Sequence, residues 1–266
     1  MSLLPSATET VCAVGAEGLL VGRSHQCDFS ESVRALPSVT VSSATGALTI
    51  DLDLLSSLQP DLILAPDPCD VRLGSSRILR LNPVSIWEVF DDMLRVGEAI
   101  GRSREAECAM VALRERWWSA VDFVNPYTTG EELVVLEGLE PPIVAGNWVP
   151  ALVTAAGARH SLNAAGVPSR RVRPEEIIEA APTRVVIAPC GLGLCESRQR
   201  LDELTRQSWW PLVPAVLDGP GRVALVDGRR SFNRPGPRLV DSFEWLVGWL
   251  NDRRELAPPG FAVEIY

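Results

Sequence analysis

Two stretches of this chain share one pattern, in which a proline precedes a short apolar run and a second proline follows it. They cover residues 60–66 and 182–189. We interpret the first proline as a helix end, the apolar run as a buried strand, and the second proline as the strand's exit. Because helix-to-strand units of this kind build parallel α/β layers, one copy in each half predicts two α/β lobes.

Further apolar runs of strand length extend this pattern along the chain. Most of them are followed by a loop and then by apolar residues at helical spacing, which again favours a parallel α/β arrangement. The predicted strands cover residues 3–4, 20–23, 61–65, 133–136, 184–188 and 222–226.

A long helical pattern lies between the two halves. Trp87, Phe90 and Trp117 belong to an apolar stripe at helical spacing, which Gly97 and Gly101 interrupt as weak points or as a break between two helices. We therefore expect an N-terminal lobe at residues 1–83, a linking helix at 84–124, a C-terminal lobe at 125–256 and a tail at 257–266.

The first ten residues predict a strand, a tight loop and a helix start. Pro5 ends the opening apolar run, and Ser6 with Glu9 forms an S-x-x-E capping box. This box places hydroxyl and backbone N–H groups together at the start of the predicted helix. This strand begins at residue 2, which leaves no leader, so the sequence as written predicts a cytoplasmic protein. The alternative is a periplasmic or cell-surface protein whose true start lies upstream.

Composition narrows the classes of partner. The 266-residue chain carries a net charge of -9 and no lysine- or arginine-rich block, which disfavours nucleic acid and anionic membranes. Its apolar runs are too short to span a membrane, and we expect a monomer. Six cysteines without a C-x-x-C pair favour free thiols in a reducing compartment.

Unusual residues follow the predicted strands. Ligands bind outside the carboxyl ends of strands in open parallel sheets, so these exits are the candidate site. They comprise residues 24–29 and 66–70 in the N-terminal half and residues 137–150, 189–196 and 227–238 in the C-terminal half.

Several of these segments resemble one known family. LLPSATE at 3–9, VGRSHQCD at 21–28 and QPDLIL at 59–64 are similar to the cobalamin-binding (class III) substrate-binding proteins of ABC importers, a class that also holds siderophore and haem binders. AGNWVP at 145–150, PCG at 189–191 and FNRPGPR at 232–238 resemble a leaderless branch of it. The resemblance implies two Rossmann-like lobes with parallel sheets, one long linking helix, and a ligand cleft between the lobes.

The resemblance also implies a function. We expect a non-enzymatic protein without an obligatory cofactor that binds cobalamin or a related corrinoid. It would serve an ABC permease as the capture component of an importer, or act as an intracellular carrier. The expected ligand-binding residues are Ser6, Thr8, His25, Cys27, Asp67, Cys69, Trp148, Cys190, Phe232, Asn233 and Arg234, with Glu196 as the permease-docking residue.

These residue types suit a corrin or porphyrin in different ways. Trp148 and Phe232 offer flat apolar surface, whereas Ser6, Thr8 and Asn233 offer polar groups for the ligand's periphery. Arg234 suits two alternative roles: it pairs with an acidic group at the edge of the ligand, or it forms an ion pair within the protein.

Two metal-related hypotheses accompany them. His25 is either an axial ligand to cobalt or iron or a hydrogen-bonded loop histidine. Cys27, Cys69 and Cys190 form either a thiolate cluster or three unrelated loop cysteines.

Two other functions stay open. One is a haem or siderophore binder, although only Tyr127 and Tyr266 are available for tyrosine ligation of a haem. The other is a chelatase-like or corrinoid-modifying enzyme that uses His25 with Asp28 or Asp67. The sequence has no G-x-S-x-G, Walker A or H-E-x-x-H motif, which favours a binding protein.

Overall fold

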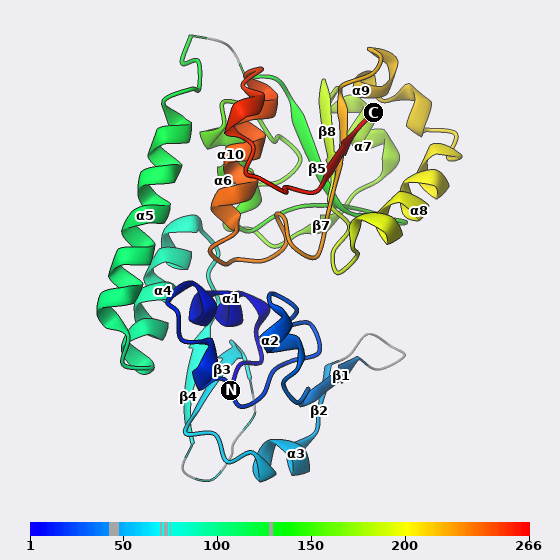
Figure 1. Ribbon diagram of the computed structural model, residues 1–266. Coiled ribbons are helices and arrows are strands. Elements are labelled where there is room, and N and C mark those ends of the chain that lie inside the picture. Colours follow the sequence, from blue (N-terminus) through cyan, green and yellow to red (C-terminus); the bar gives the residue numbers. More distant parts are fainter. Residues whose placement is uncertain (43–47, 70, 72–73, 75, 128–129) are drawn as a thin grey trace. The chain divides into compact units, whose positions relative to one another are not determined.

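The computed structural model describes residues 1–42, 48–69, 71, 74, 76–127 and 130–266, which form two compact units (Figure 1). Unit 1 comprises Met1–Pro83 and Trp87–Leu113, and unit 2 comprises Val84–Ile86 and Arg114–Tyr266. Each unit has its own layer of strands and its own core. None of the helices in the described ranges combines the length and apolar character that crossing a bilayer requires.

A parallel layer of extended segments forms the centre of unit 1. Strand β3 (Leu62–Pro66) pairs in parallel with β4 (Arg77–Leu81). On the other side of β3, Leu3 N donates a hydrogen bond to Leu64 O at 2.8 Å. Residues 22–24 lie next to this segment, because Ser2 N donates to Gly22 O at 3.1 Å. The predicted strands at 3–4 and 20–23 therefore correspond to short extended segments that join the layer through isolated bridges of Ser2 with Leu64 and Arg23.

Short elements surround this layer. A separate antiparallel pair consists of β1 (Thr40–Ser42) and β2 (Leu48–Ile50). The helices are α1 (Pro5–Ala13), η1 (Glu17–Leu19), α2 (Glu31–Arg34) and α3 (Leu52–Ser57), followed by α4 (Ile86–Ala99) and α5 (Ser103–Val121).

Helix α1 does not begin with the predicted capping box. Its N-cap is Leu4, and Pro5 occupies the first turn, where its fixed φ suits a helix and its missing N–H costs nothing. The hydroxyl of Ser2 accepts a hydrogen bond from Leu4 N at 3.4 Å. Ser6 and Glu9 therefore lie inside the helix, because the proline starts it two residues earlier than the capping box predicted.

The predicted linking segment contains two helices rather than one continuous helix. Gly101 separates α4 from α5 and has a φ of 70°, a left-handed conformation that breaks the helical path at little cost for glycine. A Cβ at Gly97 would clash with the side chain of Ala106, so the glycine allows the two helices to pack closely. Helix α5 begins at Ser103 and has 19 residues.

Unit 2 contains a six-stranded sheet in the order β10-β9-β8-β5-β6-β7. Its strands β5, β8 and β9 are parallel and match three predicted strands, whereas the outer strands pair antiparallel, so the sheet is mixed and not wholly parallel. The strands are β5 (Leu133–Leu139), β6 (Pro142–Val144), β7 (Arg170–Arg171), β8 (Arg184–Ile187), β9 (Val223–Val226) and β10 (Val263–Ile265).

The predicted tail at residues 257–266 is an integral part of unit 2. Strand β10 pairs with β9, with Val263 opposite Val226, and Tyr266 N donates to Val223 O at 2.8 Å. Phe261 stacks on Trp245 at 5.2 Å between ring centroids. The prolines and glycine at 258–260 suggested a tail, but the apolar residues beyond them bind the chain to the sheet.

Helices cover both faces of this sheet (Figure 1). On one face Val134, Ile187 and Leu225 share a core with α7, α8 and α9. Figure 1 shows α6 and α10 on the other face, to which the alternate strand residues point. The helices are α6 (Val149–Ala155), α7 (Pro174–Glu179), α8 (Leu194–Thr205), η2 (Trp210–Leu212), α9 (Pro214–Leu217), α10 (Leu239–Leu250) and η3 (Arg254–Leu256).

Candidate functional site

The carboxyl ends of β5, β8 and β9 meet at one edge of the sheet of unit 2, because these strands are parallel. Backbone and side-chain hydrogen bonds join the loops there, which we call edge 2. Cys190 N donates to Glu137 O at 2.9 Å, and Asn233 Nδ2 donates to Ala188 O at 2.7 Å and to Gly228 O at 2.9 Å. Edge 2 thus brings together three of the segments that the sequence singled out.

A cavity of about 280 Å³ opens at edge 2. Burial raises the pKa of Glu137, although a hydrogen bond with Ser169 opposes the shift. Partial burial, and then the carboxylate of Glu137, raise the pKa of the Cys190 thiol, whereas Arg234 lowers it. The polar residues that line the cavity are Glu137, Glu140, Cys190, Arg200, Glu203 and Gln207.

Asn233 holds an acceptor that no described residue satisfies. Its amide nitrogen makes both hydrogen bonds named above, but its buried Oδ1 has no donor within the described part of the chain. A buried acceptor without a donor costs about 1–3 kcal/mol. Such an atom at a strand edge favours an additional hydrogen-bond donor there, such as water or a ligand N–H.

The two aromatic residues predicted at this edge have different roles. Trp148 is half-buried, and its Nε1 donates a hydrogen bond of 2.6 Å to Phe232 O. The Phe232 side chain is fully buried and lies edge-to-face with Trp245 at 6.1 Å between centroids. The expectation that the Phe232 ring presents a flat surface to the ligand is therefore wrong, because α10 packs over this ring.

The parallel segments of unit 1 form a corresponding edge, edge 1, where residues 4–6, 25–27 and 67–69 follow the strands. His25 is half-buried there, and its Nδ1 lies 2.8 Å from the hydroxyl of Thr40, which also accepts from His25 N at 2.9 Å. These contacts orient the ring and leave Nε2 as the nitrogen available to a ligand. Nε2 has no partner among the described residues of the chain.

The Thr8 and Cys27 side chains lie in the interior of unit 1. Thr8 Oγ1 donates to Leu4 O at 3.0 Å and lies 3.0 Å from Cys27 Sγ, and both Thr8 and Cys27 are buried. Ser6 is also buried, and its carbonyl accepts from the hydroxyl of Thr10. The prediction that Thr8 and Cys27 face a ligand is wrong, because helix α1 packs its hydroxyl and the thiol against each other.

Asp67 and Cys69 follow strand β3 at edge 1. Asp67 is exposed, whereas Cys69 is half-buried against the core and its carbonyl accepts from Arg80 Nη2 at 3.1 Å. Within the described ranges no three His, Cys, Asp or Glu side chains are grouped closely enough to hold a metal ion. The three-cysteine cluster therefore has no counterpart there, and Cys27 and Cys69 belong to unit 1 while Cys190 belongs to unit 2.

The predicted docking residue is exposed at the start of α8. Glu196 Oε2 accepts from Gly193 N at 2.9 Å and from Arg229 Nη2 at 2.6 Å. The carboxylate thus caps the helix and pairs with an arginine on the surface. Its part in permease docking stays a prediction.

The structure adds residues that were not among the expected ligand-binding residues. Glu137 directly follows the apolar run of β5, within the selected exit at residues 137–150, so its position was a usable signal. Arg200 and Glu203 line the same cavity from α8. Nothing in their sequence context distinguishes them from ordinary exposed helix residues.

Comparison with known proteins supports the fold. No family model and no curated protein matches the chain. A periplasmic haem-binding protein from Pseudomonas aeruginosa matches with a TM-score of 0.78 and 21% identity, over 99% of this chain and 96% of that chain. The periplasmic vitamin B12 binding protein of Vibrio cholerae matches with a TM-score of 0.75 and 19% identity, over 96% of each chain.

A third solved structure matches with a similar TM-score, identity and coverage. The periplasmic haem-binding protein from Roseiflexus sp. RS-1 in its apo form gives a TM-score of 0.78 and 21% identity, over 95% of this chain and 97% of that chain. All three are described as periplasmic, which agrees with the alternative location and gives no support to a leaderless branch or a cytoplasmic location. All three are also described as binding proteins. The α/β architecture of two units is therefore the fold of periplasmic ligand-binding proteins.

Proposed function

We propose that this chain is a non-enzymatic binding protein that captures a corrinoid of the cobalamin type for an ABC permease, outside the cytoplasm. The observation that carries the proposal is the fold match over nearly the whole chain to proteins described as binding haem and vitamin B12. A ligand cleft between the lobes stays a prediction from the sequence.

The chemistry of edge 2 supports a ligand rich in neutral amides. Asn233 Oδ1 is a buried acceptor without a donor in the described chain, and an amide N–H would satisfy it. Glu137 lines the cavity, where its carboxylate is an acceptor for a further amide N–H. Trp148 adds partly exposed aromatic surface nearby.

Charge favours a corrinoid over haem as the first candidate. Among the described residues that line the cavity at edge 2, three are acidic (Glu137, Glu140 and Glu203) and one is basic (Arg200), in a chain with a net charge of -9. The two carboxylates of haem would meet like charge there, whereas the amides of a corrinoid would not. Haem is the second candidate, because two of the matched proteins are described as haem-binding.

Titration of the purified protein tests the proposal. Cyanocobalamin, cobinamide and haemin are added separately, and binding is measured by calorimetry and visible spectroscopy. We expect both corrinoids to bind more tightly than haemin. The proposal fails if none of the three binds at tens of micromolar, and haem becomes the ligand if haemin alone binds.

Variants at edge 2 then locate the site. Asn233→Asp removes the amide nitrogen that donates to Ala188 O and Gly228 O, so Trp148→Leu and Glu137→Gln are used instead. Because Trp148→Leu also removes the indole donor to Phe232 O, circular dichroism must first show that this variant keeps the native fold. We expect Trp148→Leu to weaken corrinoid binding at least tenfold, an effect of about 1.4 kcal/mol. Trp118→Leu, at an exposed position on α5, is the matched control and should bind as the wild type does.

The role of His25 has its own test. If Nε2 ligates cobalt, His25→Ala changes the visible spectrum of bound aquocobalamin as well as its affinity. A variant that binds with unchanged affinity and spectrum would exclude axial ligation and leave the loop-histidine interpretation. His160→Gln, which changes the chain's other histidine in a buried position, controls for general effects of histidine loss.

A further inference from the structure

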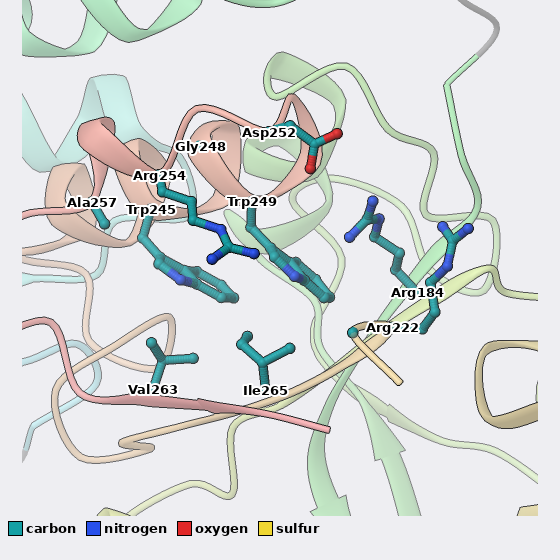
Figure 2. A pocket seen from close by; sticks show the side chains of 11 residues that line it. Arg184, Arg222, Trp245, Gly248, Trp249, Asp252, Arg254, Ala257, Val263 and Ile265 are labelled. Atoms are coloured by element: carbon teal, nitrogen blue, oxygen red, sulfur yellow. The ribbon is translucent and has the colours of Figure 1, made fainter. Parts of the chain in front are cut away.

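A second cavity lies in unit 2, away from edge 2. It has a volume of about 480 Å³ and lies between α10, the η3 turn and β10 (Figure 2). Arg184 is the first residue of β8 and Arg222 immediately precedes β9, so the arginines mark the amino ends of strands whose carboxyl ends form edge 2. The cavity is thus distinct from the candidate site described above.

Aromatic and branched aliphatic side chains form the apolar part of this cavity. Trp245 and Trp249 lie one helical turn apart on α10 and stack with 5.4 Å between centroids at 14°. Figure 2 shows the side chains of Val263 and Ile265 pointing toward these indoles from β10. Because they are two residues apart on a strand, both reach the same face. This lining suits a flat or elongated apolar group.

Arginines form the polar part. Arg184 Nε donates to Glu131 Oε2 at 2.7 Å, and Arg222 lies 3.5 Å from the same oxygen, so one carboxylate serves two arginines. The guanidinium of Arg184 lies 4.8 Å from the ring centroid of Trp249. These contacts place positive charge directly beside the apolar lining.

Arg254 adds a third guanidinium, shown above the indoles in Figure 2. Its side chain forms no ion pair or hydrogen bond with any described residue. Asp252 is the single acidic residue among those that line the cavity. The carbonyl of Tyr266 accepts from the backbone N–H groups of Gly221 and Arg222, which line the cavity, and so holds the end of β10 beside it. A guanidinium that pairs with none of the described residues offers its N–H donors to an anionic ligand.

We propose that this cavity binds a small carboxylate with a flat or elongated apolar body. The body lies against Trp245, Trp249 and the β10 side chains, and the carboxylate pairs with Arg254, supported by Arg222. The volume is within the range of small-molecule sites. This site is independent of the proposed chelate binding, because it shares no lining residue with the cavity at edge 2.

A pair of probes tests the proposal. The aryl carboxylate 2-naphthoate and its neutral analogue 2-naphthylmethanol are titrated by calorimetry and by quenching of tryptophan fluorescence. We expect 2-naphthoate to bind with a Kd below about 1 mM and the neutral analogue to bind at least tenfold more weakly. The proposal is wrong if 2-naphthoate does not bind at about 5 mM, or if the two probes bind equally.

Two variants separate the charge from the apolar lining. Arg254→Met removes an exposed charge, so it should raise the Kd of 2-naphthoate about tenfold and leave that of the neutral probe unchanged. Val263→Trp fills the cavity and should abolish binding of both probes, provided that circular dichroism shows a native fold. Arg104→Met, at an exposed position in unit 1, is the matched control and should bind both probes normally. Unchanged affinity in Arg254→Met would overturn the proposal.

A competition experiment separates this site from the proposed ligand edge. We expect saturating cyanocobalamin or haemin to leave the Kd of 2-naphthoate unchanged. Displacement of 2-naphthoate by either chelate would show that the probe occupies the chelate site, and would refute a separate carboxylate site. If neither chelate binds, the proposed function fails while the variant test of this cavity still decides its role.

Discussion

The indole N–H of Trp148 donates a 2.6 Å hydrogen bond to the backbone carbonyl of Phe232, which lies 84 residues later in the chain. Phe232 has a φ of 27°, in the left-handed region that disfavours a bulky side chain. The bond joins the loop before α6 to the loop before α10 at edge 2. One of the two predicted ligand-stacking residues thus positions the backbone of the other.

Replacing this indole tests its structural contribution. Trp148→Phe keeps an aromatic ring but removes the donor, and so leaves a buried carbonyl without a partner. We expect the free energy of unfolding to fall by about 1–2 kcal/mol, measured by urea denaturation. Trp118→Phe, at an exposed position, should change it by less than about 0.5 kcal/mol, and an equal loss in both variants would contradict the role of the hydrogen bond.

The buried His160 predicts a dependence of stability on pH. Burial lowers the pKa of His160 from 6.5 to about 4, although Glu132 nearby opposes the shift, and Nε2 accepts from Val135 N at 3.4 Å. His160 therefore binds less proton in the folded protein than in the unfolded chain between pH 6.5 and 4. The stability present above pH 6.5 falls as the pH decreases, and the loss reaches about 3 kcal/mol near pH 4.

Urea denaturation at pH 7 and pH 4 measures this loss. His160→Gln retains an acceptor for the Val135 N–H but has no titratable group. Between pH 7 and pH 4 its free energy of unfolding should therefore fall by about 3 kcal/mol less than that of the wild type. Glu137 has a raised pKa, so its contribution to stability changes in the opposite direction with pH. Identical pH profiles for the wild type and His160→Gln would refute the assignment to His160.

The cysteines should differ in reactivity according to burial and pKa. Cys108, Cys190 and Cys195 are exposed, whereas Cys27 is buried against Thr8. Burial, and then Glu17, raise the pKa of Cys12 to about 11, so little thiolate forms at pH 8. We expect iodoacetamide to label the three exposed cysteines first, with Cys195 faster than Cys190 because the pKa of Cys190 is raised.

Mass spectrometry of tryptic peptides follows this labelling over time. Cys27 should react only after urea unfolds the protein, which serves as the control for intrinsic reactivity. Rapid labelling of Cys27 in the folded protein would contradict the packing of α1 that its contact with Thr8 defines.

Strand β10 should contribute substantially to the stability of unit 2. Ending the chain after Pro259 removes β10, one of the two strands that pair with β9, and the Phe261 ring that covers Trp245. We expect a loss of about 3 kcal/mol, with faster hydrogen exchange in β9 and α10 and unchanged exchange in unit 1. A truncated protein with unchanged exchange in β9 would instead support the original prediction of a tail.

The sequence predicted the buried strands of unit 2 well, because residues 133–136, 184–188 and 222–226 are continuous apolar runs followed by turn residues. Such runs can be satisfied only inside a sheet covered on both faces. The location of a ligand edge followed from the same pattern, since parallel strands bring their exits together. Residues 190 and 233 do meet at edge 2, through contacts with Glu137 and Ala188.

The direction of individual side chains could not be predicted in this way. Thr8, Cys27 and Phe232 all lie in loops or first helical turns near strand exits, but each is directed into the core. A shift of two residues at the start of a helix changes which residues have helical geometry and where their side chains point, and Pro5 causes such a shift in α1. The pattern of apolar and polar residues therefore does not specify the direction of a single side chain.

The amino-acid sequence by itself determined the α/β class, the strands, and the carboxyl ends at which polar residues gather, because hydrophobic periodicity and proline positions are local properties. Only the tertiary structure decided which polar groups are satisfied within the fold and which are left for a ligand. Thr8 and Cys27 satisfy each other, whereas Asn233 Oδ1 and the guanidinium of Arg254 have no partner among the described residues. These outcomes depend on contacts between distant parts of the chain, and local sequence cannot specify them.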